Sequence, residues 1–204
     1  MRIGLDLDGT LVVYDAVFHR YAAERYGLPE RIPPRKTDVR AWMRASAHGE
    51  SGWIELQRLV YGPCIGEAAL APGAADFVRA AREAGADLVV VSHKTRWSVA
   101  EPPVDLRAAA LSWLEANGFF DALAFRREDI FFEPSRAAKL ARIAAERCDL
   151  FVDDLEEVFA EPSFPAGVER WLYAPGGSDD APTGVQVFAD WAELTARVGA
   201  AVAG

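Results

Sequence analysis

Lysine is scarce in this chain of 204 residues, whose 22 basic side chains comprise 19 arginines and three lysines. Arginine therefore supplies most surface charge, and each lysine is a candidate for a position that needs a compact ammonium group. Cysteine is also rare, because only Cys64 and Cys148 occur and they lie far apart in the sequence. This spacing argues against a disulfide framework and favours a reducing compartment.

Long apolar runs are missing, and Met1 leads directly into a short strand-like segment. We therefore expect no membrane span and no signal peptide, and a cytoplasmic location. The formal net charge of −9 argues against nucleic acid or an anionic membrane as a partner, since both favour positive surfaces. A phosphate-bearing ligand would need local positive charge or a metal ion.

Strand-like and helical segments alternate along the chain, which predicts an α/β fold with right-handed crossovers. Apolar runs that finish in polar residues are typical of buried strands in a parallel sheet. We therefore expect a three-layer α/β/α, Rossmann-like core with a mostly parallel sheet. Its strands are expected in RIGLDL (residues 2–7), ADLVVVSH, DIFF, CDLFVDDLEEV, VERWLYAPGG and GVQVFADWAEL, the last of which also begins a closing helix.

A helical insert interrupts this pattern after the first strand. Helical spacing over about residues 14–27, 38–47 and 52–61 predicts a compact group of helices. The expected organisation is a core of residues 1–13 and 72–204 with an inserted unit of residues 14–71.

The first strand ends in two aspartates, Asp6 and Asp8, which project to the same side because strand side chains alternate. Two neighbouring carboxylates repel each other unless a cation or a shared proton offsets the cost. Other expected strands end in Ser92-His93-Lys94 and in Asp153-Asp154, and Lys139 lies on the helix before the last of these. In parallel sheets, ligands bind at the carboxyl ends of the strands.

The order and spacing of these motifs resemble the haloacid dehalogenase-like superfamily. DLDGT matches its first motif, VVVSHKT the second, Lys139 the third and LFVDDLEEV the fourth. The resemblance covers nearly the whole chain. It implies the phosphatase branch, with the insert as a small helical cap of the C1 type that closes over the active site.

A phosphomonoester is strongly anionic, so a nucleophilic carboxylate can approach it only beside a cation. Mg²⁺ takes carboxylate, phosphate and water oxygens. Asp6, Asp153 and a backbone carbonyl near Asp8 are the expected protein ligands, with Asp154 either as a further ligand or as a residue that holds metal-bound water. In this scheme Asp6 attacks phosphorus, and Asp8 protonates the leaving oxygen before it deprotonates the attacking water.

The remaining expected roles concern the phosphate and the substrate. Ser92 and the amides of Leu7 and His93 would hold phosphate oxygens, while Thr10 would bond the local backbone. Lys139 is the expected third-motif lysine, with Lys94 as its rival and Arg136 as an auxiliary contact. The predicted specificity residues on the insert are Tyr14, His19, Arg20, Trp42, Arg44 and Trp53.

The expected activity is hydrolysis of a small phosphorylated metabolite, and several alternatives stay open. A phosphomutase would use the same four motifs, and the insert would alternatively serve homodimer formation. A dehalogenase has no need of Asp8 or the Asp153–Asp154 pair, and a phosphonate hydrolase needs an insert lysine, for which Lys36 is the candidate. A phosphoacceptor domain of the receiver type and a non-catalytic binding relative are the non-enzyme alternatives.

Overall fold

The computed structural model describes residues 1–203, with side chains described for residues 1–199. The chain forms two compact units. The sheet unit contains Met1–Val12, Leu70–Lys94 and the residues from Gly118 onward, and the helical unit contains Val13–Ala69 and Thr95–Asn117. Among the described residues, none of the helices combines the length and the apolar character needed to span a bilayer.

A six-stranded, fully parallel sheet forms the centre of the sheet unit. The spatial order is β5-β4-β1-β6-β7-β8, so the chain builds outward from β1 on one side and then continues on its other side with β6. The carboxyl ends of β1, β4 and β6 therefore meet beside a topological switch point. The strands are β1 (Arg2–Leu5), β4 (Asp87–His93), β5 (Ile130–Glu133), β6 (Leu150–Asp153), β7 (Glu169–Tyr173) and β8 (Val185–Phe188).

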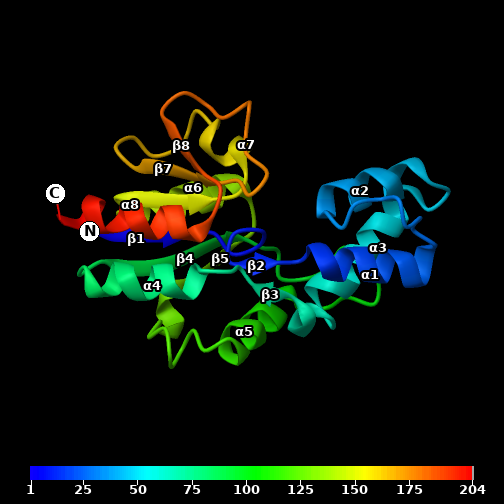
Figure 1. Cartoon of the computed structure of the whole chain (residues 1–204). Helices are drawn as coiled ribbons and strands as arrows, with labels where there is room; N and C mark the ends of the chain where they lie inside the picture. The colour runs from blue at the N-terminus through cyan, green and yellow to red at the C-terminus, as the bar shows by residue number, and fades with distance from the viewer. Residues whose placement is uncertain (204) are drawn as a thin grey trace. The chain divides into compact units, whose positions relative to one another are not determined.

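Helices flank this sheet, as Figure 1 shows. Helix α6 (Arg136–Ala145) packs on β4 and β5, whereas α4 (Ala74–Glu83) packs against α8 (Trp191–Ala203). Successive side chains of β7 point to opposite faces of the sheet. Leu172 joins the apolar cluster that contains α6 residues, whereas Tyr173 packs against Trp191 of α8. This arrangement confirms the predicted α/β/α core. The remaining elements are η2 (Arg127–Asp129) and α7 (Glu156–Phe159).

Side-chain capping fixes the start of α6, the helix that carries Lys139. The Ser135 hydroxyl accepts a hydrogen bond from the Ala138 amide at 3.1 Å, as the sequence predicts. This bond satisfies one of the amides that the first helical turn leaves unpaired. The Lys139 amide then donates to the Ser135 carbonyl at 3.0 Å, so the position of Lys139 on the helix is well determined.

The helical unit is built around an aromatic cluster. Phe18 stacks on Trp53 with ring centroids 5.0 Å apart, and Tyr61 meets both Phe18 and Tyr14 edge to face. The unit also includes residues 95–117, which the sequence analysis places with the core. Its elements are α1 (Asp15–Tyr26), α2 (Lys36–Ala45), α3 (Gly49–Tyr61), η1 (Ile65–Glu67) and α5 (Leu106–Ala116). A separate pair of two-residue strands, β2 (Val12–Val13) and β3 (Ala69–Leu70), lies where the chain passes between the units.

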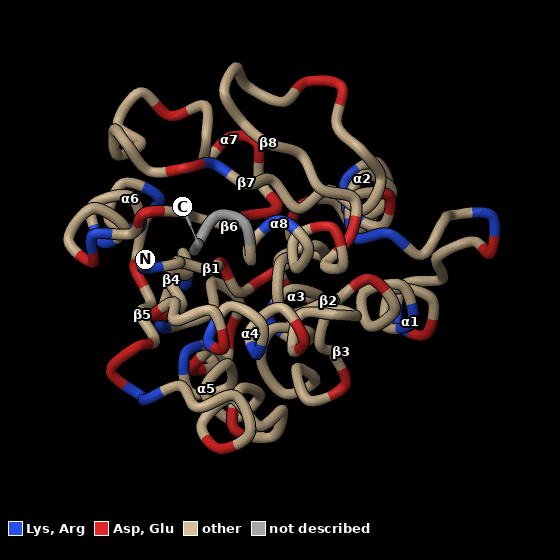
Figure 2. The backbone as a smooth tube through the Cα atoms, turned by 60° about the vertical axis from the view of Figure 1, so that its left-hand side comes forward, with Lys and Arg blue, Asp and Glu red and all other residues tan. Residues whose placement is uncertain are grey.

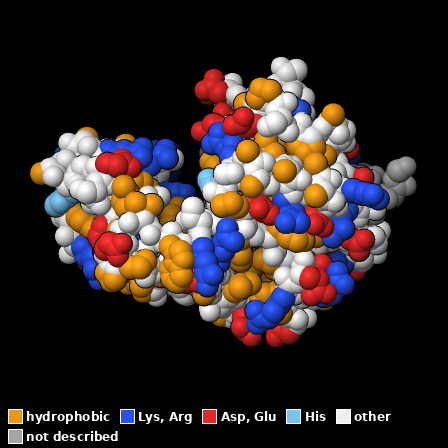
Figure 3. Space-filling view, turned by 180° about the vertical axis from the view of Figure 1, so that it is seen from behind, with side chains coloured by type: hydrophobic (Ala, Val, Ile, Leu, Met, Phe, Trp, Pro, Cys, Tyr) orange, Lys and Arg blue, Asp and Glu red, His pale blue; other side chains and the backbone are white. Residues whose placement is uncertain are grey.

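Charged residues of both signs are interspersed along the chain, as the tube in Figure 2 shows. On the face drawn in Figure 3, basic, acidic and hydrophobic side chains are likewise intermixed. With a net charge of −9, the chain attracts an anion only where particular basic side chains are held in place. The position of each buried lysine is therefore informative.

Candidate active site

Two aspartates lie side by side at the carboxyl edge of the sheet. Asp6 directly follows β1, and Asp153 is the last residue of β6, the neighbouring strand. The Asp6 amide donates to the Val152 carbonyl at 2.9 Å, which extends the pairing of β1 and β6 up to the acidic residues. Both side chains are buried. The strand register thus places two carboxylates in an environment that penalises charge.

Lys139 supplies the positive charge between these two acids. Its Nζ lies 2.6 Å from Asp6 Oδ1 and 2.6 Å from Asp153 Oδ2, and the lysine is 2% exposed. Burial by itself would lower the pKa of Lys139, but Asp153 and Asp6 outweigh this effect and raise it. The side chain therefore stays an ammonium group, which holds the two carboxylates in a fixed arrangement.

The Asp6 carboxyl has a strongly perturbed pKa. Burial raises the pKa to about 7; the neighbouring Asp153 adds to the rise and the Lys139 ammonium opposes it. One ammonium cannot fully compensate two buried carboxylates. The Asp6 carboxyl is thus ionised only in part at neutral pH, unless another cation joins the site.

A tight turn after β1 carries Asp8 and contacts Asp154, which follows β6. The amides of Leu11 and Val12 both donate to the Leu7 carbonyl, and Gly9 has φ +100°. A Cβ on Gly9 would lie 2.2 Å from Asp154 Oδ2, so only glycine allows this carboxylate to approach the turn. The Thr10 hydroxyl, on the same turn, donates to Asp154 Oδ1 at 3.2 Å.

Asp8 forms an ion pair with Lys94. The distance from Lys94 Nζ to Asp8 Oδ2 is 2.6 Å, and the lysine is only 4% exposed. The sequence identifies both residues as site candidates but gives no sign of their pairing. Of the two rival lysines, Lys139 contacts Asp6 and Lys94 contacts Asp8.

Three aspartates lie close enough together to hold a cation. Asp6, Asp153 and Asp154 each offer one carboxylate oxygen, and these oxygens lie within 4.8 Å of one another. Oxygens about 2.0–2.1 Å from a shared Mg²⁺ would be separated by roughly 3–4 Å, which this spacing accommodates with small side-chain movements. The site contains four carboxylates (Asp6, Asp8, Asp153 and Asp154) and two lysines, so with every acid ionised two negative charges remain. The donor set therefore fits Mg²⁺.

The other predicted site residues fall into three groups. Ser92, 1% exposed, lies near the end of β4, and His93 beside it is exposed, with a pKa lowered by partial burial and by Lys139. The Leu7 side chain is fully buried, which leaves only its peptide group for binding. Tyr14 belongs to the helical unit, where its ring is 2% exposed and packs against Tyr61.

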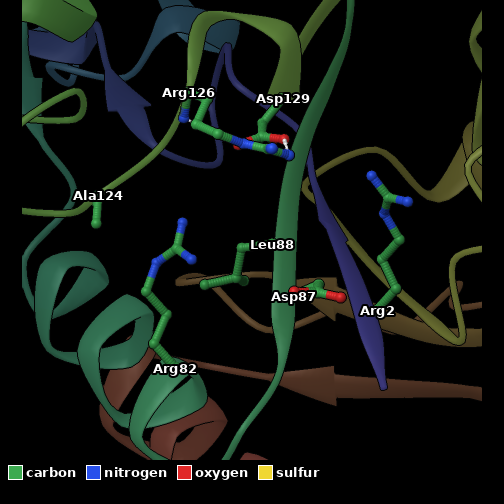
Figure 4. Close-up of a pocket in the computed structure, with 7 residues that line it drawn as sticks. All are labelled: Arg2, Arg82, Asp87, Leu88, Ala124, Arg126 and Asp129. Carbon is green, nitrogen blue, oxygen red and sulfur yellow. Dashed lines mark hydrogen bonds and ion pairs between the residues drawn. The ribbon is translucent and has the colours of Figure 1, made fainter.

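A second charged hollow lies at the opposite edge of the sheet, near the start of β1 and β4 (Figure 4). Its cavity volume is ≈ 270 Å³. Three arginines and two aspartates line it: Arg2, Arg82 and Arg126, with Asp87 and Asp129. Arg126 binds Asp129 at 2.8 Å, and Arg2 binds Glu146 at 3.0 Å. Asp6, Asp8 and Asp153 lie at the other end of these strands, so the carboxyl edge is the candidate active site.

Comparison with known proteins gives structural matches only. No family model and no curated protein matches the sequence. A hydrolase of the haloacid dehalogenase (HAD) family from Deinococcus radiodurans, solved with phosphate and sodium, has a TM-score of 0.54 at 17% identity and covers 97% of this chain and 87% of its own. The L-2-haloacid dehalogenase RSc1362 reaches a TM-score of 0.59 at 14% identity, with 97% of both chains covered.

A phosphoserine phosphohydrolase-like protein from Francisella tularensis is similar too, with a TM-score of 0.52 at 14% identity over 96% of this chain and 98% of its own. These similarities extend over almost the full length of every chain compared. In this chain the first, second and fourth motifs lie at strand ends, and Lys139 of the third lies on α6. The chain therefore has the fold of the haloacid dehalogenase-like hydrolases.

Proposed function

We propose that this protein is a Mg²⁺-dependent phosphatase that hydrolyses a small phosphomonoester through an aspartyl-phosphate on Asp6. The observation that supports this proposal best is the contact of Lys139 with both Asp6 and Asp153. An Asp154 oxygen lies within 4.8 Å of oxygens of both acids, so that one metal ion could contact all three. A nucleophile, a fixed ammonium and a set of metal ligands are then present within one group of side chains.

The expected metal ligands are Asp6, Asp153, Asp154 and a backbone carbonyl near Asp8. When bound, Mg²⁺ would offset the repulsion between the Asp6 carboxylate and an anionic phosphate. Lys139 would neutralise further charge on the transferring group. The Ser92 hydroxyl and the amides of Leu7 and His93 would donate to phosphate oxygens.

The reaction then has two steps. In the first, an Asp6 carboxylate oxygen bonds to phosphorus while the bond from phosphorus to the leaving oxygen breaks; that oxygen keeps the electron pair and takes a proton from Asp8. In the second, Asp8 removes a proton from a water molecule whose oxygen attacks phosphorus. The Asp6–phosphorus bond breaks, which releases phosphate and restores both carboxyl groups.

Hydrolytic dehalogenation is the main competing chemistry, because one structural neighbour is an L-2-haloacid dehalogenase. That reaction also uses an aspartate nucleophile but needs no second acid and no cation. A dehalogenase would gain nothing from Asp8, or from the buried Asp153 beside Asp154. These acids favour phosphate transfer.

Turnover of p-nitrophenyl phosphate with Mg²⁺ and with a chelator tests the proposal. We expect activity that depends on Mg²⁺, and we expect Asp6→Asn to lower it by more than about 10³-fold, because only residual binding and positioning remain without the nucleophile. A parallel assay with 2-haloacids should release no halide. Halide release, or phosphatase activity retained in Asp6→Asn, would contradict the proposal.

Asp76→Asn provides the matched control. It makes the same chemical change on α4, at a side chain that is 78% exposed and outside the site. Its activity should equal that of the wild type. A panel of phosphorylated metabolites, assayed with both variants, would then identify the substrate.

A further inference from the structure

Lys94 is held in place by its backbone. It follows β4, and its amide donates to the Glu133 carbonyl at 2.9 Å, which continues the pairing of β4 with β5 by one residue. The side chain is 4% exposed and reaches back across the carboxyl edge to Asp8. The Lys94 backbone is therefore fixed by the sheet, and its ammonium group is held by the ion pair with Asp8.

Asp8 has a fixed backbone but a side chain in contact with solvent. Its residue bridges to Val12, and the Gly9 amide donates to the Val12 carbonyl at 2.9 Å. The Asp8 side chain is 19% exposed, far more than those of Asp6 or Asp153. Without a bound partner, an aspartate in such a position can occupy several staggered rotamers. The ion pair with Lys94 selects one of them.

The choice of lysine supports a specific role. Two of the three lysines in the chain, Lys94 and Lys139, are buried in this site, in a protein with 19 arginines. Burying an ion pair carries a desolvation cost and stabilises a fold only weakly. A contribution to the geometry of the reaction explains why an ammonium is buried here.

We propose that Lys94 is a positioning residue, which holds the Asp8 carboxylate in the orientation needed for proton transfer instead of binding the substrate phosphate. This proposal rests on the proposed function, in which Asp8 moves the proton in both steps. It assigns each lysine to a different acid: Lys139 orients the nucleophile, and Lys94 orients the acid–base group.

The experiment measures the two steps separately with p-nitrophenyl phosphate and Mg²⁺. The burst of nitrophenolate reports formation of the phosphorylated enzyme. The decay of the phosphorylated enzyme, measured in samples quenched with acid at successive times, reports its hydrolysis. Nitrophenolate leaves readily without a proton donor, so the first step depends little on Asp8. We expect Lys94→Met to keep the burst and to slow the decay by about 10- to 100-fold, within the roughly 10²–10⁴-fold that a positioned acid or base contributes.

A double-mutant cycle identifies the residue through which Lys94 acts. In the Asp8→Asn background, Lys94→Met should slow the decay by less than about twofold, because the group that it orients is already lost. If Lys94 instead binds phosphate, Lys94→Met should weaken inhibition by inorganic phosphate equally in both backgrounds. That result would overturn the proposal, as would full additivity.

Three controls keep the outcome decisive. Arg79→Met removes an exposed charge from α4 and should change neither step. Lys94→Arg restores the charge and should recover part of the decay rate, which a general loss of folding would not allow. If the wild type forms no phosphorylated enzyme, the proposed function fails; if it does and Lys94→Met behaves like the wild type, only the role of Lys94 fails.

Discussion

At the scale of single residues, Gly9 connects the turn after β1 to the expected metal site. A Cβ at this position would lie 2.2 Å from Asp154 Oδ2, and φ is +100°. Gly9→Ala should therefore displace the Asp154 carboxylate as well as strain the backbone. We expect a higher Mg²⁺ concentration for half-maximal phosphatase activity, together with a loss of about 1–2 kcal/mol in the free energy of unfolding.

Gly177→Ala is the matched control for this prediction. Gly177 has φ +75°, and no heavy atom lies within 4 Å of the Cβ that alanine would add. The strain is then similar, but no site residue is displaced. If Gly177→Ala and Gly9→Ala raise the Mg²⁺ requirement equally, the contact with Asp154 has no role in metal binding.

At the scale of elements, the first turn of α6 positions Lys139. Removing the cap with Ser135→Ala should lower the free energy of unfolding by about 0.5–2 kcal/mol, because the Ala138 amide loses its partner. It should also lower kcat, since Lys139 lies one turn into the helix and must contact two carboxylates. Urea unfolding and steady-state kinetics check both effects.

Ser135→Asp separates capping from the serine itself, because aspartate is an equally good N-cap residue. It should retain the stability and most of the activity. If Ser135→Ala loses stability but keeps full kcat, the start of α6 does not determine the position of Lys139.

The elements also show what the sequence can predict. The strands that lead to Asp6 and Asp153 are predictable, because apolar runs that end in acids identify parallel strands and their shared edge. The pairing of Lys94 with Asp8 is not predictable, because it depends on how far the lysine side chain reaches from the end of β4 toward the turn after β1. Residues 95–117 are assigned to the core by sequence order alone, whereas Trp113 donates from its indole to the Ala68 carbonyl at 2.8 Å inside the helical unit.

At the scale of the whole molecule, the raised pKa of Asp6 links folding to pH. The pKa of Asp6 is about 7 in the folded protein, against 3.8 for an aspartate in water, so between these pH values the folded state holds a proton that the unfolded state has released. The contribution of Asp6 to stability is therefore present below pH 3.8 and is lost as the pH rises toward 7. The loss is at most about 1.4 kcal/mol per pH unit.

This linkage gives a prediction for the metal-free protein. From pH 5 to pH 7 the wild type should lose free energy of unfolding relative to Asp6→Asn, since the variant has no proton to release at this position. Urea titrations in a chelating buffer measure it, and a difference that stays constant with pH would contradict it. With millimolar Mg²⁺ the slope should disappear, because a folded state that binds the cation through ionised Asp6 holds no more protons there than the unfolded state does. Buried acids that destabilise the empty protein at neutral pH would then bind the cation that the proposed reaction requires.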